Sequence, residues 1–304
     1  MSNITPAPHG VPAPVVADDQ DLSLSPAQLA WRRFRRNKMA MGAAIILLLL
    51  VLMSFVGPFL YKVSPDLVDP RNFRQPPNAA HALGTDSAGR DVLARLMAGG
   101  RVSLAIGLIA AFISTVIGIA FGIIAGYFRG WADSVLTRVA EVFQSFPALI
   151  IIIVVVAFLG PSVPLLTVTL GLLQWTAAFR VTRGVTMSLR EQDSIQAVEG
   201  LGGTPFHILL RHMVPAVLPH ATVAFTLLTA TVVMTEAGLS FLGLGVPPPT
   251  PTWGSMISEA QSLRILETMP WMWLPPGIAI ALTVMGVNFI GDGLRDAVDP
   301  RQSR

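Results

Sequence analysis

The sequence predicts an all-α integral membrane protein with six membrane-spanning helices. Of its 304 residues, 52% are hydrophobic and only 13% are charged, whereas charged residues make up about a quarter of a typical soluble domain. The hydrophobic residues gather in uncharged runs that, as helices, would cross the ~30 Å hydrocarbon core of a bilayer. The chain has no cysteine, which excludes disulfides and thiolate metal sites.

The N-terminal part predicts a tail, a basic helix and the first span. Residues 1–25 are rich in Pro, Ala and Asp and lack the apolar core of a signal peptide, so we expect a disordered tail. Residues 26–62 then form a unit. A helix begins at Ser25-Pro26, basic residues follow, and the uncharged run Met39–Tyr61 spans the membrane. The basic cluster indicates the cytoplasmic side or an amphipathic helix at the membrane surface, and the two readings are compatible.

The next segment predicts an extracytoplasmic loop followed by a tightly packed span. Residues 63–101 are polar and contain several prolines, and the run Val102–Phe128 is uncharged. Small residues recur every four positions along this run and let another helix approach closely. They are Ser114, Gly118, Gly122 and Gly126.

Four further spans complete the predicted membrane core of residues 102–293. The uncharged stretch Val142–Phe179 is too long for one helix, and Gly160-Pro161 divides it into the third and fourth spans. The remaining expected segments are a polar loop over 181–218, a fifth span over about 219–244, a sixth over about 272–291 and a charged tail over 294–304. About two-thirds of the 21 lysines and arginines then fall on one side, which predicts that both termini are cytoplasmic.

The chain carries no phosphate-binding loop. A Walker A motif ends in Gly-Lys-Ser/Thr, because its lysine must reach the terminal phosphates of the nucleotide. The only two lysines, Lys38 and Lys62, follow Asn37 and Tyr61. Any ATP and Mg²⁺ that drive this protein are therefore expected on a partner, and we expect this chain to bind no cofactor of its own and to have no catalytic residues.

The loop around residues 194–219 has the pattern of a helix, a break and a second helix. Ser194–Leu201 predicts a short helix, and glycines follow it closely enough to end it. Thr204-Pro205 then caps a helix over Phe206–Met213 with an apolar face of Phe206, Leu209, Leu210 and Met213. Such a face must be covered by a partner protein or lie on the bilayer. His207 and His212, five residues apart, are expected to point in different directions.

This segment resembles the EAA loop through which ABC importer permeases contact their ATPases. The chain has Gln196-Ala197-Val198, then Gly202 at the spacing that the family pattern requires, and the ending His212-Met213-Val214-Pro215. It departs from the family pattern with Gln in place of Glu and Val in place of the second Ala. The resemblance implies that the second helix ends at Pro215. The implied docking residues are Gln196, Ala197, Val198, Gly202, Thr204, Pro205, Phe206, Leu209, Arg211, His212 and Pro215.

Three more segments are similar to the second, or C-type, permease subunit of dipeptide, oligopeptide and nickel importers. They are Leu83–Val92, Leu239–Gly245 and Gly291–Pro300. The resemblance implies a type I importer fold in a bacterial inner membrane and peptide transport. It also implies a homologous second permease, two ABC ATPases and an extracytoplasmic binding protein as partners. We expect no nucleic-acid partner, since the arginines form no separate basic domain.

Other candidate sites are weaker. Asp86, Arg90 and Asp91 lie close together in the sequence. Ion pairs that order an outer loop are a simpler explanation of this cluster than a catalytic site. Glu236 lies within the fifth span near its outer end, and a structural hydrogen-bonded role and a role in the substrate path both stay open. The five histidines show no metal-ligand spacing.

Three alternative functions remain. An importer of nickel or another small solute would have the same fold, and its binding protein's ligand would separate it. A secondary transporter would usually carry paired intramembrane charges or an inverted repeat, and neither is visible. An intramembrane enzyme would need paired catalytic side chains within the spans, and the sequence shows no such pair.

Overall fold

The computed structural model describes residues 26–298, so the tail expected over 1–25 and the last residues of the one over 294–304 lie outside the described part. Within that part the chain is helical, apart from loops and one isolated β-bridge between Thr85 and Asp91. Its elements are α1 (Pro26–Arg36), α2 (Lys38–Phe55), α3 (Gly57–Leu60), η1 (Pro70–Asn72), α4 (Val92–Phe128), α5 (Gly130–Ser145), α6 (Ala148–Leu159), α7 (Val163–Leu173), α8 (Trp175–Arg190), α9 (Asp193–Gly200), α10 (Pro205–Ile208), the π-helical turn η2 (Leu209–Met213), α11 (Val214–Phe241), α12 (Trp253–Ser258), α13 (Leu263–Thr268) and α14 (Pro270–Val298).

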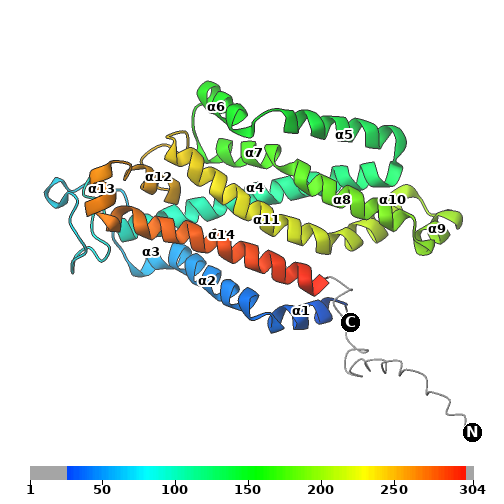
Figure 1. Ribbon diagram of the computed structural model, residues 1–304, viewed down its shortest axis with the longest axis horizontal. Coiled ribbons are helices and arrows are strands. Elements are labelled where there is room, and N and C mark those ends of the chain that lie inside the picture. Colours follow the sequence, from blue (N-terminus) through cyan, green and yellow to red (C-terminus); the bar gives the residue numbers. More distant parts are fainter. Residues whose placement is uncertain (1–25, 299–304) are drawn as a thin grey trace, which may run out of the picture.

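The long helices lie side by side along the long axis of the molecule (Figure 1). Short helices α3, α12 and α13 gather at one end, and α9 lies at the other end together with the start of α1 and the end of α14. In the described residues, five helices are long and apolar enough to cross a membrane, and the bent pair α5–α6 can supply a sixth. The predicted all-α membrane fold is confirmed, with α9 and both described chain ends on one side.

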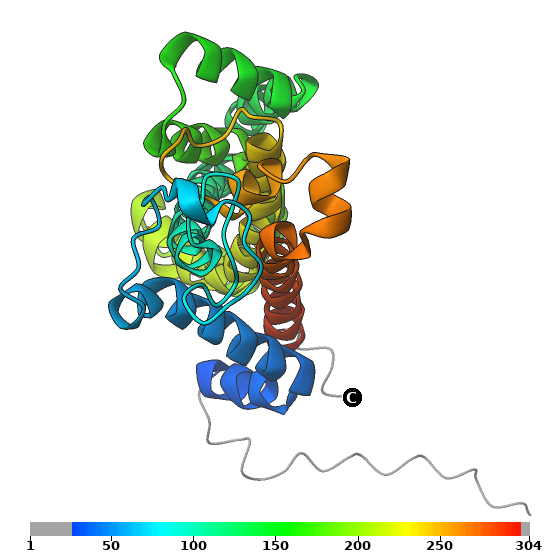
Figure 2. The ribbon, with the colours of Figure 1, turned by 90° about the vertical axis from the view of Figure 1, so that its left-hand side faces the viewer.

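The third span differs from the prediction. The uncharged run was expected to start at Val142, but α5 begins at Gly130 and continues to Ser145, and α6 follows at an angle of 77°. Pro147 causes this bend. Proline disfavours helical geometry in the residue before it, and Phe146 accordingly has φ −96° and ψ 133°. In Figure 2, α5 and α6 lie at one edge of the helix bundle.

Two other boundaries also move outward. Helix α4 begins at Val92 and not at Val102, so Arg95 and Arg101 are helical and do not belong to the outer loop. Helix α8 runs to Arg190, well past the expected end at Phe179. As a result, most of the segment 181–218 is helix and not loop.

The glycine stripe of α4 packs against α8. A Cβ atom placed on Gly118, Gly122 or Gly126 would lie 2.5, 2.6 or 2.7 Å from a side-chain atom of Ala178, Thr182 or Thr186 respectively. The partner residues are also spaced by four, so two rows of small side chains face each other along the two helices. Close backbone approach of this kind is a common way to hold membrane helices together.

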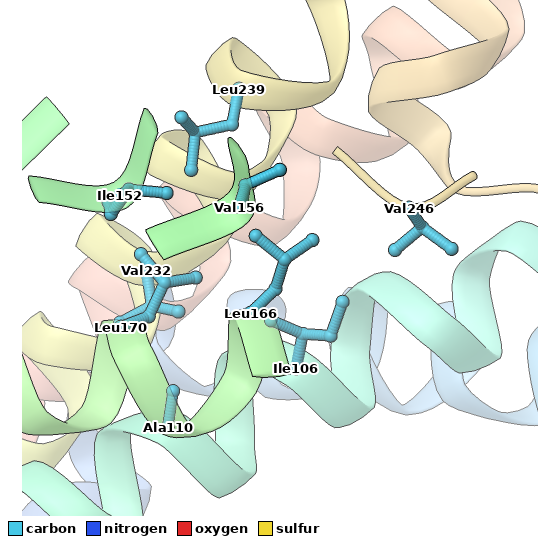
Figure 3. Packing of buried hydrophobic residues seen from close by; sticks show 9 residues of the cluster. All are labelled: Ile106, Ala110, Ile152, Val156, Leu166, Leu170, Val232, Leu239 and Val246. Carbon is cyan, nitrogen blue, oxygen red and sulfur yellow. The ribbon is translucent and has the colours of Figure 1, made fainter. Parts of the chain in front are cut away.

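The largest buried apolar cluster joins α4, α6, α7 and α11 (Figure 3). Its members are Ile106, Ala110, Ile152, Val156, Leu166, Leu170, Val232, Leu239 and Val246. Val246 comes from the loop after α11, so this loop is held against the bundle. Packing of α6 against this cluster fixes the second half of the bent pair.

Candidate functional site

The first part of the candidate site is the turn that ends α9. The amide of Gly203 donates to the carbonyl oxygen of Val198 at 2.9 Å, and that of Gly202 donates to Glu199 at 3.0 Å. Gly202 has φ +85°, the left-handed geometry that glycine adopts most easily. These bonds form a Schellman turn, which satisfies the last carbonyls of α9. The helix break expected here therefore has a defined geometry.

The second helix begins at Thr204. Its Oγ1 accepts the amide of His207 at 3.4 Å, and Pro205 occupies the first turn, where a missing N–H costs nothing. The start of this helix thus follows directly from the Thr-Pro pair.

The expected end of the second helix at Pro215 is wrong. Helical geometry continues from Pro205 to Phe241, through the turn η2 and into α11. The amide of Val214 donates to Leu209, five residues back, which is π-helical bonding. Pro215 has no amide to donate, and in a regular α-helix its ring would clash with the carbonyl of Arg211. The wider turn immediately before Pro215 therefore allows the helix to continue.

The apolar residues of this helix divide between two faces. Met213 is buried and packs with Ile195 of α9 and with Ile123 and Tyr127 of α4. Phe206 and Leu210, by contrast, point to the outside and are 72% and 54% exposed. The single apolar face expected for Phe206, Leu209, Leu210 and Met213 is therefore corrected, because the π-turn shifts the register by which residues share a face.

The same turn brings two histidines together. The ring centroids of His207 and His212 lie 5.8 Å apart, whereas the sequence predicted that they would diverge. Residues five apart diverge on an α-helix but approach one face where the bonds run from i to i+5.

Leu201 adds a third exposed apolar side chain, at the turn between the helices, and it is 88% exposed. We call Leu201, Phe206 and Leu210 the apolar surface. Among the expected docking residues, Gln196, Ala197 and Arg211 are also exposed. Sequence reasoning had not assigned Leu201 to docking and had named Leu210 only as part of the apolar face, because their exposure depends on the glycine turn and on the π-turn.

Polar contacts tie α8, which ends just before α9, to its neighbours. Arg190 donates to the carbonyl of Tyr127, and its guanidinium lies 5.2 Å from the centre of the Tyr127 ring. Arg129 donates from Nη2 to Glu191 Oε1 at 2.8 Å. Arg183 bonds Asp133 through two nitrogens, with Nη2 2.7 Å from Oδ2, and so ties α8 to α5. The end of α8, from which α9 follows, is thus tied to both α4 and α5.

A second polar group of residues lies at the opposite end of the molecule. Arg90 Nε donates to Asp86 Oδ2 at 2.7 Å, and Arg95 lies 3.3 Å from the same oxygen. Glu259 accepts from both arginines, at 2.8 Å from Arg90 and 2.9 Å from Arg95. Burial raises the pKa of Glu259, and the two arginines partly offset that effect. We call these four residues the outer ion-pair network.

The carboxylate of Asp91 has a different role from its neighbours in that network. Its Oδ1 accepts the amide of Ala94 at 2.8 Å and so caps α4. Its Oδ2 accepts the Tyr61 hydroxyl at 2.9 Å and lies 2.9 Å from His81 Nδ1. Burial, together with this carboxylate, raises the pKa of Tyr61 to about 12. The cluster read from the sequence is thus an ordered loop built from ion pairs and a cap.

Comparison with known proteins gives the family. Residues 118–304 match the profile of the binding-protein-dependent transport system inner membrane component, and residues 25–77 match the N-terminal transmembrane domain of oligopeptide transport permease C. The first match covers more than half of the chain. The chain belongs to this inner membrane component family. It is a permease component of an ABC importer and a multi-pass protein of a bacterial inner membrane.

Curated relatives resemble this permease over nearly its whole length. A putative peptide permease of Brucella suis is 38% identical over 279 residues, which is 92% of each chain. The glutathione transport system permease GsiD of Escherichia coli is 38% identical over 289 residues, 95% of this chain and 94% of its own. Among solved structures, the inward-facing MetNI methionine ABC transporter gives a TM-score of 0.54 at 21% identity, over 67% of this chain and 96% of that one. That likeness shows a shared fold.

Glu236 of this permease is held inside the helix bundle. Its side chain is 1% exposed and accepts hydrogen bonds from Ser240 at 2.7 Å and Ser103 at 3.1 Å. Ser103 also accepts the backbone amide of Trp253 at 3.2 Å. Since these groups come from α4, α11 and α12, the carboxylate joins three elements. Of the two roles left open for Glu236, this geometry favours the structural one.

Proposed function

We propose that this permease imports peptides as one half of a permease pair. A homologous second permease would form the other half, and the substrate would cross between the two. An extracytoplasmic binding protein would deliver the peptide, and two ABC ATPases would hydrolyse ATP with Mg²⁺. The proposal of a peptide substrate is supported by the relatives named peptide permease and glutathione permease, since glutathione is itself a tripeptide.

The apolar surface is the observation that carries the coupling role. Leu201, Phe206 and Leu210 are exposed on a segment whose buried side chains pack against α4. Exposed apolar groups in such an arrangement favour a protein contact. Exposed Gln196 and Arg211 lie in the same segment, and this mixture of apolar centre and polar surroundings is typical of a protein interface.

Coupling would then follow from the connectivity of the site. Closure of the ATPases on ATP would move the apolar surface, and the unbroken helical run Pro205–Phe241 would carry that movement along the bundle. Contacts of Arg190 and Arg183 would bring α4, α5 and α8 with it. The path between the permeases would open alternately to the outside and to the inside.

Reconstitution of the complex tests the peptide proposal. The subunit is extracted mildly from its native membrane, and copurifying chains are identified by mass spectrometry. The complex is then placed in proteoliposomes and supplied in turn with dipeptides, glutathione, methionine and Ni²⁺. ATP-dependent uptake of a peptide supports the proposal. Uptake of Ni²⁺ or methionine without any peptide would overturn the substrate class, and recovery of the chain without an ATPase would overturn the ATP-driven mechanism.

A matched pair of variants tests the apolar surface. Phe206→Ala removes an exposed ring at the proposed contact, and Phe158→Ala removes one that is 84% exposed at the end of α6. We expect Phe206→Ala to reduce substrate-stimulated ATPase activity by 10-fold or more, roughly the ~1.4 kcal/mol of a modest interface contact. Phe158→Ala should leave it unchanged. Equal effects of both variants would contradict the docking role.

A further inference from the structure

Helix α1 is seated on the end of α14 by one aromatic side chain. Phe34 is buried and packs with Ala40 of α2 and Ala297 of α14. The seat depends on Gly293, since a Cβ there would lie 3.2 Å from the Phe34 ring and 2.5 Å from the Ala40 Cβ. Helix α1 is therefore held in one orientation at the end of the bundle where α9 also lies (Figure 1).

The outward side of α1 carries an arc of basic residues. At 100° per residue, Trp31, Arg32, Arg35 and Arg36 fall within about 140° of the helix circumference, and the three arginines lie about 100° or more from Phe34. Arg32, Arg35 and Arg36 are exposed, and Trp31 is 60% exposed and stacks on Phe34 at 6.0 Å. These four residues surround a surface hollow of about 350 Å³. Residues 26–38 of the sequence contain no Asp or Glu.

An apolar groove lies beside this arc, between α2 and α14. Its volume is about 220 Å³, and Lys38 lines it together with apolar residues from both helices. The other lining residues are Met39, Gly42, Ala43, Ile46, Leu282, Met285, Gly286 and Phe289. Lys38 is exposed and follows Arg36 by two residues, so the groove begins next to the basic arc. Most of α2 faces outward, and only 17% of its 18 residues are buried inside the molecule.

We propose that this arc and groove form a binding site for one anionic phospholipid of the inner leaflet. The arginines and Lys38 hold the phosphate-bearing headgroup, Trp31 lies at the level of the interface, and an acyl chain lies in the groove. A phosphate group accepts the forked N–H pairs of arginine, and aromatic side chains prefer the interface region. Basic clusters directly cytoplasmic of a span bind anionic lipids in this way.

A bilayer lipid fits better than a soluble anion because the two features adjoin. A free phosphate would use the arginines but leave the groove empty. A neutral lipid would use the groove, but its headgroup would bring no net charge to the three arginines and Lys38. Only an anionic lipid satisfies both.

Lipid retention measured on the full-length chain tests the proposal. The protein in mild detergent is equilibrated with equal amounts of phosphatidylglycerol and phosphatidylethanolamine of identical acyl chains, and bound lipid is counted by native mass spectrometry. We expect the wild type to prefer phosphatidylglycerol by 5-fold or more. Arg32→Gln/Arg35→Gln/Arg36→Gln should lose that preference. Arg71→Gln/Arg180→Gln/Arg264→Gln, which removes the same charge from exposed positions elsewhere, should keep it.

Two further comparisons keep the result decisive if the glutamine variant inserts poorly. Replacement of the three arginines by lysine keeps the charge and should keep at least half of the preference. Gly42→Leu fills the groove at a position with nothing within 4 Å, and it should reduce bound lipid, whereas Gly277→Leu at an equally open position of α14 should not.

Three outcomes would overturn the site. The first is an unchanged phosphatidylglycerol preference in the glutamine variant, which would leave the arginines as a topology signal alone. The second is displacement of the lipid by 20 mM inorganic phosphate, which would assign the cluster to a soluble anion. The third is equal loss of lipid in Gly42→Leu and Gly277→Leu.

Discussion

Arg95 donates from Nη2 to Glu259 Oε1 at 2.9 Å, and this contact joins the first turns of α4 to the segment that follows α12. The side chain of Arg95 is almost fully buried, so its charge depends on Glu259 and Asp86 for compensation. The outer end of the permease is thus held together by a buried cation and by residues far apart in the chain.

Removal of the Glu259 charge should loosen that outer end. Glu259→Gln leaves Arg95 without one of its two carboxylates, and breaking a buried ion pair costs about 3 kcal/mol. We expect a lower midpoint of thermal unfolding in detergent, while Glu267→Gln on exposed α13 should be neutral. A wild-type midpoint in Glu259→Gln would show that the outer ion-pair network contributes nothing to stability.

Replacement of Gly202 by a residue with a side chain should weaken the coupling between ATP hydrolysis and transport. A residue with a side chain at φ +85° is strained by about 1–2 kcal/mol. The strain is conformational, because nothing lies within 4 Å of a Cβ at this position. We expect Gly202→Leu to insert normally but to weaken substrate-stimulated ATPase activity in the reconstituted complex.

Gly200→Ala is the matched control for that experiment, since Gly200 is helical and also has nothing within 4 Å. It should keep full stimulation. Equal stimulation in Gly202→Leu and Gly200→Ala would speak against a role of the Schellman turn in coupling.

The glycine stripe should tolerate no added methyl group at Gly122. A Cβ there lies 2.6 Å from the Cβ of Thr182, and overpacking of this kind costs about 1–3 kcal/mol. Gly122→Ala should therefore lower the unfolding temperature. Gly184→Ala, on α8 but facing open space, should leave it unchanged or raise it, because alanine favours helix by about 1 kcal/mol. The reverse order would contradict the packing of α4 on α8.

Tyr61 should resist ionisation at alkaline pH. The protein has two tyrosines, so Tyr127→Phe leaves Tyr61 as the only one. Its pKa is raised from 10.0 to about 12 in the folded state, so its contribution to stability is present below pH 10 and is lost as the pH rises through about 12. We expect tyrosinate absorbance to stay low up to pH 11 in the folded variant and to rise near pH 10 after unfolding. Coincident titrations would disprove the Tyr61–Asp91 contact.

The sequence predicted the class of the fold and several of its breaks, because these depend on local chemistry. Uncharged runs identified the spans, Gly202 the turn after α9, and Thr204-Pro205 the start of α10. The bend at Pro147 could also have been inferred from the residue type. By contrast, the π-turn before Pro215 was missed, because a proline after a short helix can mark a helix end as well as a wider turn within a longer helix.

Contacts between residues far apart in the chain could not be predicted from local sequence patterns either. Glu259 lies 164 residues from Arg95, and no spacing rule relates the two positions. Arg95 was placed in the outer loop because a charged residue lowers the apparent hydropathy of a helix start. Once α4 is seen to begin at Val92, the same residue becomes a buried member of a network.

The helical run from Pro205 to Phe241 continues without a break from the segment of the apolar surface to the level of Glu236. Its 37 residues correspond to a rod of about 55 Å at 1.5 Å per residue. Glu236 fixes the far part of that rod to Ser103 of α4 and, through Ser103, to α12. With this pivot held, a tilt of about 5° moves the near end by roughly 4 Å. A small rotation about Glu236 therefore corresponds to a displacement next to the apolar surface that is comparable to the diameter of a side chain.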